Sequence, residues 1–374
     1  NWSITTDDGI NMLDPSKKPH ENLQFQLVLA CILKAVDEHA DLLRESAADV
    51  GNDHRLGANE APPAIISIYL GEQLDDVVQQ IIKTGSADHS LKGESLTTGV
   101  DTLPDFRKDA TDRNRTSPFA FTGNKFEFRM VGSKDSISGP NVVLNTIVAE
   151  AFKEACDILE KADDFEKEAK ALICKYLTEH QRIVFNGNGY TDEWVAEAEK
   201  RGLPNIRSMV DAIPALTTDK AVKLFEEFGV FTKAELESRA EIQYEAYVKA
   251  INIEAKTMID MAKKTIIPAV IKYTTSLADS IISVKACGVD PEVQTELLQK
   301  ISAHLKEAQK ALGALEAITA KAAAIEDMPT AARAYHDEVM PAMTALRTPV
   351  DAMEVLVDKK DWPMPAYSDL IFEV

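Results

Sequence analysis

Cysteine is scarce in this sequence of 374 residues. The four that occur, Cys31, Cys156, Cys174 and Cys287, are widely spaced and form no C-x-x-C pair. Disulfide frameworks and structural zinc sites use clustered cysteines, so this pattern argues against both. Because most of the four lie in apolar stretches with helical spacing, we expect reduced core thiols in a cytoplasmic protein.

Basic residues are few relative to acidic ones. Lys and Arg number 41 against 61 Asp and Glu, which gives a formal net charge of -20 at pH 7. A chain this acidic disfavours non-specific binding to nucleic acid or to an anionic membrane. It also has no run of 18 apolar residues, about the length that a membrane-spanning helix requires. The composition therefore indicates a globular protein, long enough for two or three domains.

Unlike charges are concentrated in one short segment, residues 112–129, which reads DRNRTSPFAFTGNKFEFR. From residue 124 to residue 130 polar and aromatic or apolar side chains alternate, which predicts a strand with two different faces. One face would carry Lys125, Glu127 and Arg129, and the other two phenylalanines and a methionine.

The charged face has two interpretations. It could be an exposed sheet surface whose side chains form salt bridges. Alternatively it is a cleft floor, where Glu127 binds a hard metal ion while Lys125 and Arg129 meet phosphate or carboxylate groups. Arg113 and Arg115, shortly upstream, favour the anion site, because arginine recognises planar oxyanions in a bidentate manner.

The segments before this strand alternate between a helix and loops. Apolar residues at helical spacing predict an amphipathic helix over about 21–46. Glycines and prolines then predict a loop over 51–63, which is either a surface turn or a place for binding residues. A β-like run follows at 64–70. Residues 85–112 form a long polar excursion, of a kind usual near a site or as a lid.

From residue 142 to about residue 359 the pattern is almost entirely helical. A capping box at 232–235 predicts the start of a long helix, which Pro268 would kink or break. Asp290-Pro291-Glu292 predicts another helix start. We expect an antiparallel bundle or an oligomer-facing layer, followed by an extended tail over 361–368 that docks on a surface. His304 and His336 are isolated, which is typical of ordinary surface or core histidines.

Three local matches, in order along the chain, resemble the glutamine synthetases, and in particular the large bacterial type III class. Residues 55–56 (RL) followed by 60–62 (EAP) resemble the family's flap. Residues 114–116 (NRT) resemble its NRS segment, and residues 126–129 (FEFR) resemble its E-x-R strand. The order and the approximate separation of the matches are far more specific than any single tripeptide.

This resemblance implies an enzyme that joins glutamate and ammonia into glutamine through γ-glutamyl phosphate, with ATP and Mg²⁺ or Mn²⁺ as cofactors. Glu127 would be a metal ligand. Arg115 would steady the γ-phosphate and the phosphorylated intermediate. Glu60 would close the site against water and take a proton from bound ammonium.

The resemblance also implies positions for the substrates. Arg55 and Arg129 would bind glutamate, and Lys125 and Ser3 would lie near the nucleotide. Two departures from the family pattern concern this region: the step from Arg55 to Glu60 is one residue shorter, and an alanine at 120 stands where the family has a second phosphate-binding arginine.

An α+β fold is implied, with residues 1–150 as the C-terminal part of the catalytic domain, an antiparallel sheet with helices. Residues 151–374 would be a helical type III region. Family members assemble as stacked rings, so a homo-oligomer, a dodecamer by resemblance, is expected. The family's β-grasp domain and most of its metal ligands precede the position of Asn1, so we expect residues 1–374 to be part of a longer enzyme and inactive alone.

Two other functions stay open from the sequence. One is a related γ-glutamyl ligase that uses an amine in place of ammonia. The other is a non-catalytic helical assembly protein that has kept the fold. The combination of Glu60, Arg115, Glu127 and Arg129 argues against the second, because a scaffold does not need so much charge in one cleft.

Overall fold

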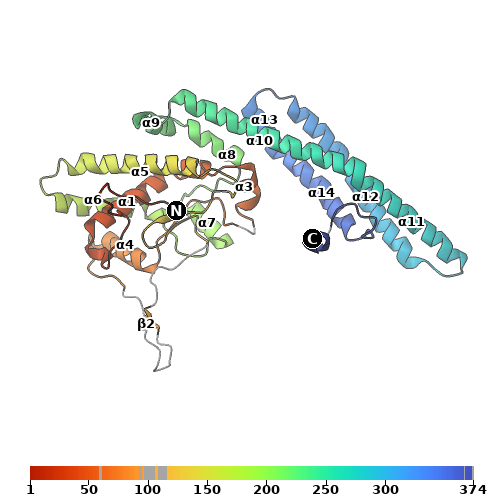
Figure 1. Ribbon diagram of the computed structural model, residues 1–374, viewed down its shortest axis with the longest axis horizontal. Helices are drawn as coiled ribbons and strands as arrows, with labels where there is room; N and C mark the ends of the chain where they lie inside the picture. The colour runs from red at the N-terminus through yellow and green to blue at the C-terminus, as the bar shows by residue number, and fades with distance from the viewer. Residues whose placement is uncertain (59–60, 92–94, 97–105, 108–115, 366, 373–374) are drawn as a thin grey trace. The chain divides into compact units, whose positions relative to one another are not determined.

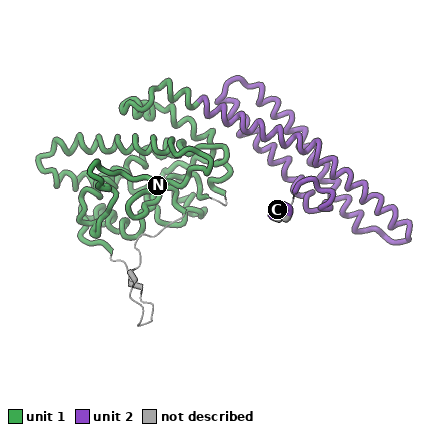
Figure 2. Tube along the Cα trace, viewed as in Figure 1, with its two compact units in different colours: residues 1–240 green, residues 241–374 purple. Residues whose placement is uncertain are grey.

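The computed structural model describes residues 1–58, 61–91, 95–96, 106–107, 116–365 and 367–372. The chain divides into two compact units, residues 1–240 and residues 241–374 (Figure 2). It is mostly helical and has a small mixed sheet in its first unit (Figure 1). The expected domain boundary at residue 150 lies within a helix. This boundary was placed at the end of the family's catalytic domain, which a division into compact units does not test, so it stays a prediction.

Helices make up most of the first unit. Their bounds are α1 Leu23–Glu38, α2 Ala40–Glu45, α3 Val50–Arg55, α4 Glu72–Thr84, α5 Ser138–Leu159, α6 Phe165–His180, α7 Asp192–Lys200, α8 Met209–Ala212 and α9 Asp219–Glu227. The buried helix α1 packs against both α5 and α6, which lie beside each other in Figure 1. These three helices enclose much of the apolar core of the unit.

The sheet of the first unit has the strand order β1-β4-β5, with β1 at Ile68–Tyr69, β4 at Phe119–Phe121 and β5 at Phe126–Phe128. β1 pairs with β4 in parallel, whereas β4 and β5 are antiparallel. The sheet is therefore mixed, and not the purely antiparallel one that was expected. β1 and β4 are far apart in sequence, and the intervening chain lets the two strands run in the same direction.

Strand β5 confirms part of the alternation seen in the sequence: Phe126 and Met130 are buried, but Phe128 is only half-buried. Phe126 is fully buried and stacks on Phe119 of β4, with ring centroids 4.5 Å apart. Met130, four residues after Phe126, is buried as well. The burial of these apolar side chains against β4 holds the charged face of β5 on the opposite side.

Two local predictions for residues 21–63 are wrong. The expected single helix is interrupted at His39, whose φ of -119° and ψ of 31° leave the helical region, so that α1 ends and α2 begins. Within the expected loop, α3 forms because Asp49 caps it: its carboxylate accepts a hydrogen bond from the backbone N–H of Gly51 at 2.7 Å. Arg55 is therefore the last residue of a helix.

The long excursion at 85–112 also contains regular structure. Strands β2 (Ser95–Leu96) and β3 (Phe106–Arg107) pair in an antiparallel ladder. The rest of the excursion after residue 91 lies outside the described residues, so its expected role near a site or as a lid stays a prediction.

The second unit consists of long helices. Their bounds are α10 Lys233–Met261, which begins in the first unit, α11 Ile267–Ala286, α12 Glu292–Ala323, α13 Met328–Ala334, α14 Met340–Glu354 and α15 Tyr367–Phe372. α12 packs against both α11 and α14 (Figure 1). None of the described helices is long and apolar enough to cross a membrane.

The start of α10 confirms the predicted capping box. The backbone N–H of Thr232 donates to Glu235 Oε2 at 2.8 Å, and the N–H of Glu235 donates to Thr232 Oγ1 at 3.4 Å. Pro268 lies in the first turn of α11, directly after a π-helical segment at Ala262–Ile266. A local π turn accommodates the missing N–H of proline, so the chain continues as helix instead of breaking.

All four cysteines are free, but the expectation of core thiols holds for only part of them. Cys31 is buried in α1, and burial raises the pKa of its thiol to about 12. Cys156 and Cys287 are exposed, and Cys174 is intermediate.

Candidate functional site

The charged face of β5 is partly buried and internally paired. Glu127 Oε2 accepts hydrogen bonds from Arg129 Nη2 at 2.7 Å and from Arg129 Nε at 3.1 Å. The two side chains are only 17% and 22% exposed, respectively. Because a two-nitrogen contact with one carboxylate oxygen fixes both groups, this is an ordered and partly buried ion pair.

Helix α3 holds the end of this strand. Arg55 donates from Nη1 to the carbonyl oxygen of Met130 at 2.9 Å and from Nη2 to that of Arg129 at 3.2 Å. Asn52, which is 2% exposed, donates from Nδ2 to the same Met130 carbonyl at 2.9 Å. The structure therefore places Arg55 beside the end of the strand that carries Glu127. Its contacts there are with backbone carbonyl groups and not with the charged side chains.

The first residues of the chain lie along the other side of β5. Trp2 and Phe126 form an antiparallel bridge, with N–H to carbonyl distances of 2.8 and 2.9 Å. This pairing puts Ser3 across from Lys125, so the two residues expected near the nucleotide are neighbours. The hydroxyl of Ser3 donates to Asn11 Oδ1 at 2.9 Å.

Glu60 and Arg115 lie outside the described residues, but their flanks are placed. Leu56 and Ala61 form a bridge that closes the base of the loop expected to be the flap, and Gly57 N donates to the carbonyl oxygen of Ala61 at 3.2 Å. On the β4 side, the register pairs Ala120 with Glu127. Directly paired residues project from the same face of a sheet, so the alanine that replaces the family's arginine lies beside the candidate metal ligand.

Sequence reasoning missed one contact near Arg115. The glycine-rich segment 186–190 is the turn before α7, whose first turn is capped by Thr191. The same turn also holds the start of β4: Gly189 N donates to Thr116 Oγ1 at 2.9 Å. A Cβ on Gly189 would come 2.5 Å from the carbonyl oxygen of Thr116, so only glycine fits this approach.

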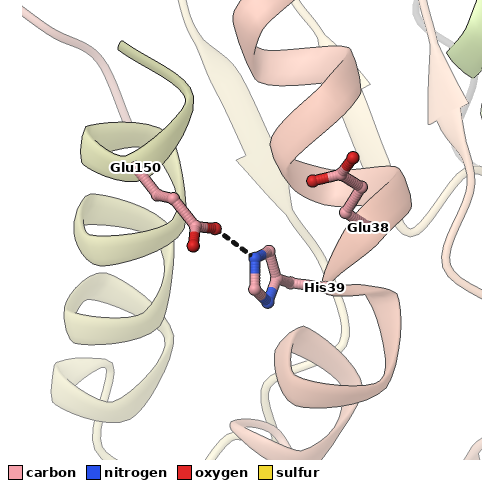
Figure 3. A group of neighbouring side chains, drawn as sticks. All are labelled: Glu38, His39 and Glu150. Carbon is pink, nitrogen blue, oxygen red and sulfur yellow. Dashed lines mark hydrogen bonds and ion pairs between the residues drawn. The ribbon is translucent and has the colours of Figure 1, made fainter. Parts of the chain in front are cut away.

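A second cluster of ionisable groups lies away from β5. Among the described residues, Glu38, His39 and Glu150 form the one group of three whose ligand atoms lie within 4.8 Å of one another (Figure 3). His39 Nε2 is already bonded to Glu150 Oε2 at 2.6 Å, and the Glu38 carboxylate is paired with Lys34 Nζ at 2.6 Å. Lys220 also donates to the backbone carbonyl of Glu38.

Two ammonium groups beside this cluster would repel a bound cation, and its best ligand atoms are used by each other. We therefore interpret it as an ion-pair network. It connects α5 to the corner between α1 and α2. The backbone leaves helical geometry at the buried His39, and Glu150 provides the hydrogen-bond partner that the buried imidazole requires.

This network predicts a pH dependence of stability. The hydrogen bond from His39 holds the pKa of Glu150 below its ordinary value of 4.5. A carboxyl with a depressed folded-state pKa stabilises the fold above its unfolded-state pKa, and this contribution is lost as the pH falls through the folded-state value. The thermal midpoint of the unsubstituted protein should therefore fall as the pH is lowered from about 5 to about 3. In Glu150→Gln the midpoint should fall less over the same pH range.

The control for this experiment is Glu160→Gln, which removes the same charge from an exposed position at the end of α5. It should leave the acid slope unchanged. Equal slopes for the unsubstituted protein and for Glu150→Gln would contradict the assignment.

Comparison with known proteins bears on these groups. The chain is 41% identical over 386 residues to the type-3 glutamine synthetase of Dictyostelium discoideum, and 40% identical over 385 residues to the glutamine synthetase of Butyrivibrio fibrisolvens. In both cases the whole chain is matched, together with 52% and 54% of the relative's length. The chain is related to the glutamine synthetases. Residues 168–285 also match the model of the glutamine synthetase C-terminal domain.

These comparisons confirm the resemblance that the three motifs indicated. The glutamine synthetase of Bacteroides fragilis (strain YCH46) is similar in the same way, at 34% identity over 384 residues and 53% of its length. The chain thus spans about half the length of the curated glutamine synthetases it matches.

The groups on β5 fit one part of the metal site that such enzymes are expected to hold. Glu127 offers a carboxylate, the oxygen ligand that Mg²⁺ and Mn²⁺ favour, from a rigid strand. A two-metal site needs several such ligands, and this strand supplies one. Glu127 would have to share its carboxylate between Arg129 and an ion, and the positive charge of the arginine would weaken the attraction of this carboxylate for the ion.

Proposed function

We propose that this chain forms part of a glutamate–ammonia ligase, which makes glutamine from glutamate, ammonia and ATP through γ-glutamyl phosphate. The observation that carries the proposal is the similarity to glutamine synthetases along the whole chain. The partly buried face of β5 supports it, because paired charges on an ordered strand suit the binding of anionic substrates.

Glu127 and Arg129 have the central roles in this proposal. Mg²⁺ or Mn²⁺, when bound, neutralises the charge of the transferring phosphate, and Glu127 would be one of the ligands. Arg129 would bind the substrate carboxylate. An arginine has five N–H donors in a planar fork, so its contact with Glu127 is compatible with a second carboxylate.

The remaining assignments follow from the resemblance. Arg115 would stabilise the phosphorylated intermediate, and Glu60 would take a proton from ammonium. Lys125 and Ser3 would lie near the nucleotide, a role supported by their positions across from each other. Arg55 would act at the glutamate side, where it already holds the carbonyls of the strand that carries Arg129.

The proposal extends to the assembly and to the two regions of the chain. Residues 1–150 would belong to the catalytic domain, and the helices after them to a type III region that contributes contacts in a homo-oligomer of stacked rings. The place of action would be the cytoplasm, where unpaired cysteines such as the four in this chain are usual.

The test is a glutamine assay on the full-length protein. Glutamate, ATP and a divalent ion are supplied with either ammonium or a primary amine, and glutamine or the amide product is measured together with released phosphate. We expect ammonium to be the preferred acceptor. A faster reaction with an amine would point to the related γ-glutamyl-amine ligase, and no reaction with either would refute the ligase assignment.

Residues 1–374 alone should give no glutamine in the same assay. The chain spans about half the length of the glutamine synthetases it matches, and Glu127 is the one metal ligand that we assign to it, whereas a two-metal site needs several. The full-length protein prepared in parallel is the control. Robust ATP-dependent turnover by residues 1–374 would overturn this prediction.

A further inference from the structure

The carboxamide of Asn52 is a buried junction in the first unit. It is 2% exposed, and its Nδ2 donates to the carbonyl oxygens of Ala47 at 2.7 Å and of Met130 at 2.9 Å. Its Oδ1 accepts from Arg55 Nη1 at 3.3 Å. Both donors and one acceptor site of the amide are thus used inside the protein, which is the arrangement that makes a buried amide stabilising and not costly.

These contacts connect two parts of the chain that are remote in sequence. Ala47 precedes α3 and Arg55 is its last residue, whereas Met130 lies just after β5 and 78 residues from Asn52. Asn52 and Arg55 together donate hydrogen bonds to two consecutive carbonyl groups, those of Arg129 and Met130. One short helix therefore sets the position of the flap base relative to the charged strand.

We propose that Asn52 is a positioning residue for Glu127 and Arg129. The inference rests on the proposed function for its consequence, and on the hydrogen bonds for its geometry. Asn52 does not touch the substrates in this proposal. It acts through the main chain of residues 129–130, and so determines where the Glu127 carboxylate and the Arg129 guanidinium stand.

The chemistry of the junction requires an amide at this position. Aspartate has the same size, but an ionised carboxylate only accepts hydrogen bonds, and it would face two carbonyl oxygens that also only accept. Asn52 is almost fully buried, so a longer side chain would have to displace its neighbours. A shift of the strand end by even about 1 Å would misplace the reacting groups enough to reduce turnover strongly.

The experiment compares Asn52→Asp, and the milder Asn52→Ser, with Gln26→Glu in the full-length protein. Gln26 is a matched control, because it is another buried amide, and its Nε2 donates to the carbonyl oxygen of Pro19 at 2.8 Å and not to β5. Three quantities are measured: the thermal midpoint, kcat and KM for glutamate, and the affinity for Mn²⁺ by electron paramagnetic resonance.

We expect both types of variant to lower the thermal midpoint. Only the Asn52 variants should also weaken Mn²⁺ binding and lower kcat/KM for glutamate, by about 10- to 100-fold, the range found for groups that orient metal ligands. Asn52→Ser, which keeps one donor, should lie between the unsubstituted protein and Asn52→Asp, and it reports if the aspartate variant fails to fold.

The outcomes separate this inference from the proposed function. If the unsubstituted protein makes no glutamine, the proposed function fails, and the comparison of Mn²⁺ affinities still decides the positioning role. If it makes glutamine and the Asn52 variants match Gln26→Glu in both Mn²⁺ affinity and kcat/KM, Asn52 has only a structural role and the inference is overturned.

Discussion

Replacing Glu127 by glutamine in the full-length protein should lower kcat/KM for glutamine formation by about 100- to 1,000-fold, the range that the loss of one key electrostatic group produces. The substitution keeps the size of the side chain and removes its charge. Two effects add: the proposed metal site loses an anionic oxygen, and Arg129 loses the carboxylate that holds its Nε and Nη2 atoms. Both would disturb the charged face of β5.

The two effects can be separated in the same experiment. Loss of a metal ligand predicts that the apparent requirement for Mg²⁺ or Mn²⁺ rises, whereas loss of the Arg129 contact predicts a higher KM for glutamate at saturating metal. Glu193→Gln, an exposed acid in the first turn of α7, makes the same change in net charge and should leave turnover as it was. Normal turnover by Glu127→Gln would refute its metal role.

The second large effect concerns stability. Asp37 lies in α1 with a side chain that is 3% exposed, and it accepts from His180 Nδ1 at 2.8 Å. It also accepts from Arg182 Nε, at 2.9 Å to Oδ1 and 3.1 Å to Oδ2. Asp37→Ala would leave both partners without their acceptor, and because His180 is itself buried we expect a loss of about 3 kcal/mol in the unfolding free energy of the first unit.

The measurement needs a signal from the first unit alone, since a chain with two units does not have to unfold in one step. Trp2 and Trp194 lie in the first unit and Trp362 in the second, so a Trp362→Phe background makes tryptophan fluorescence report on residues 1–240. In this background, urea unfolding of Asp37→Ala should show a lower midpoint.

Asp157→Ala serves as the comparison for that experiment. Asp157 pairs with Lys153 on the exposed surface of α5, where solvent screens the pair, so its removal should hardly move the midpoint. If Asp37→Ala behaved like Asp157→Ala, the buried network would contribute little to stability.

Local patterns in the sequence predicted several features correctly. Alternation located β5 and its buried phenylalanine, and the capping box located the start of α10. These signals depend on neighbours within a few residues, so they can be evaluated without the fold. The family motifs also identified the relatives, because the type and the order of the reactive side chains can be taken from the sequence without the fold.

Local patterns gave wrong predictions where residues distant in sequence determine the local backbone structure. Glycines around α3 suggested a loop, yet the cap from Asp49 and the bonds of Asn52 to Met130, 78 residues away, stabilise a helix. Helical spacing likewise continued through His39, but its bond to Glu150, 111 residues away, supports a break. Such partners depend on the path of the chain, which periodicity does not contain.

For the charged face of β5, the sequence by itself determined which groups are present and on which side of the strand they lie. Only the tertiary structure decided how they are held: Glu127 by Arg129, and the strand end by Arg55 and Asn52 from α3. The physical reason is that the face of a strand follows from its period of two residues, whereas the hydrogen-bond partners of its carbonyls come from whichever element packs beside it.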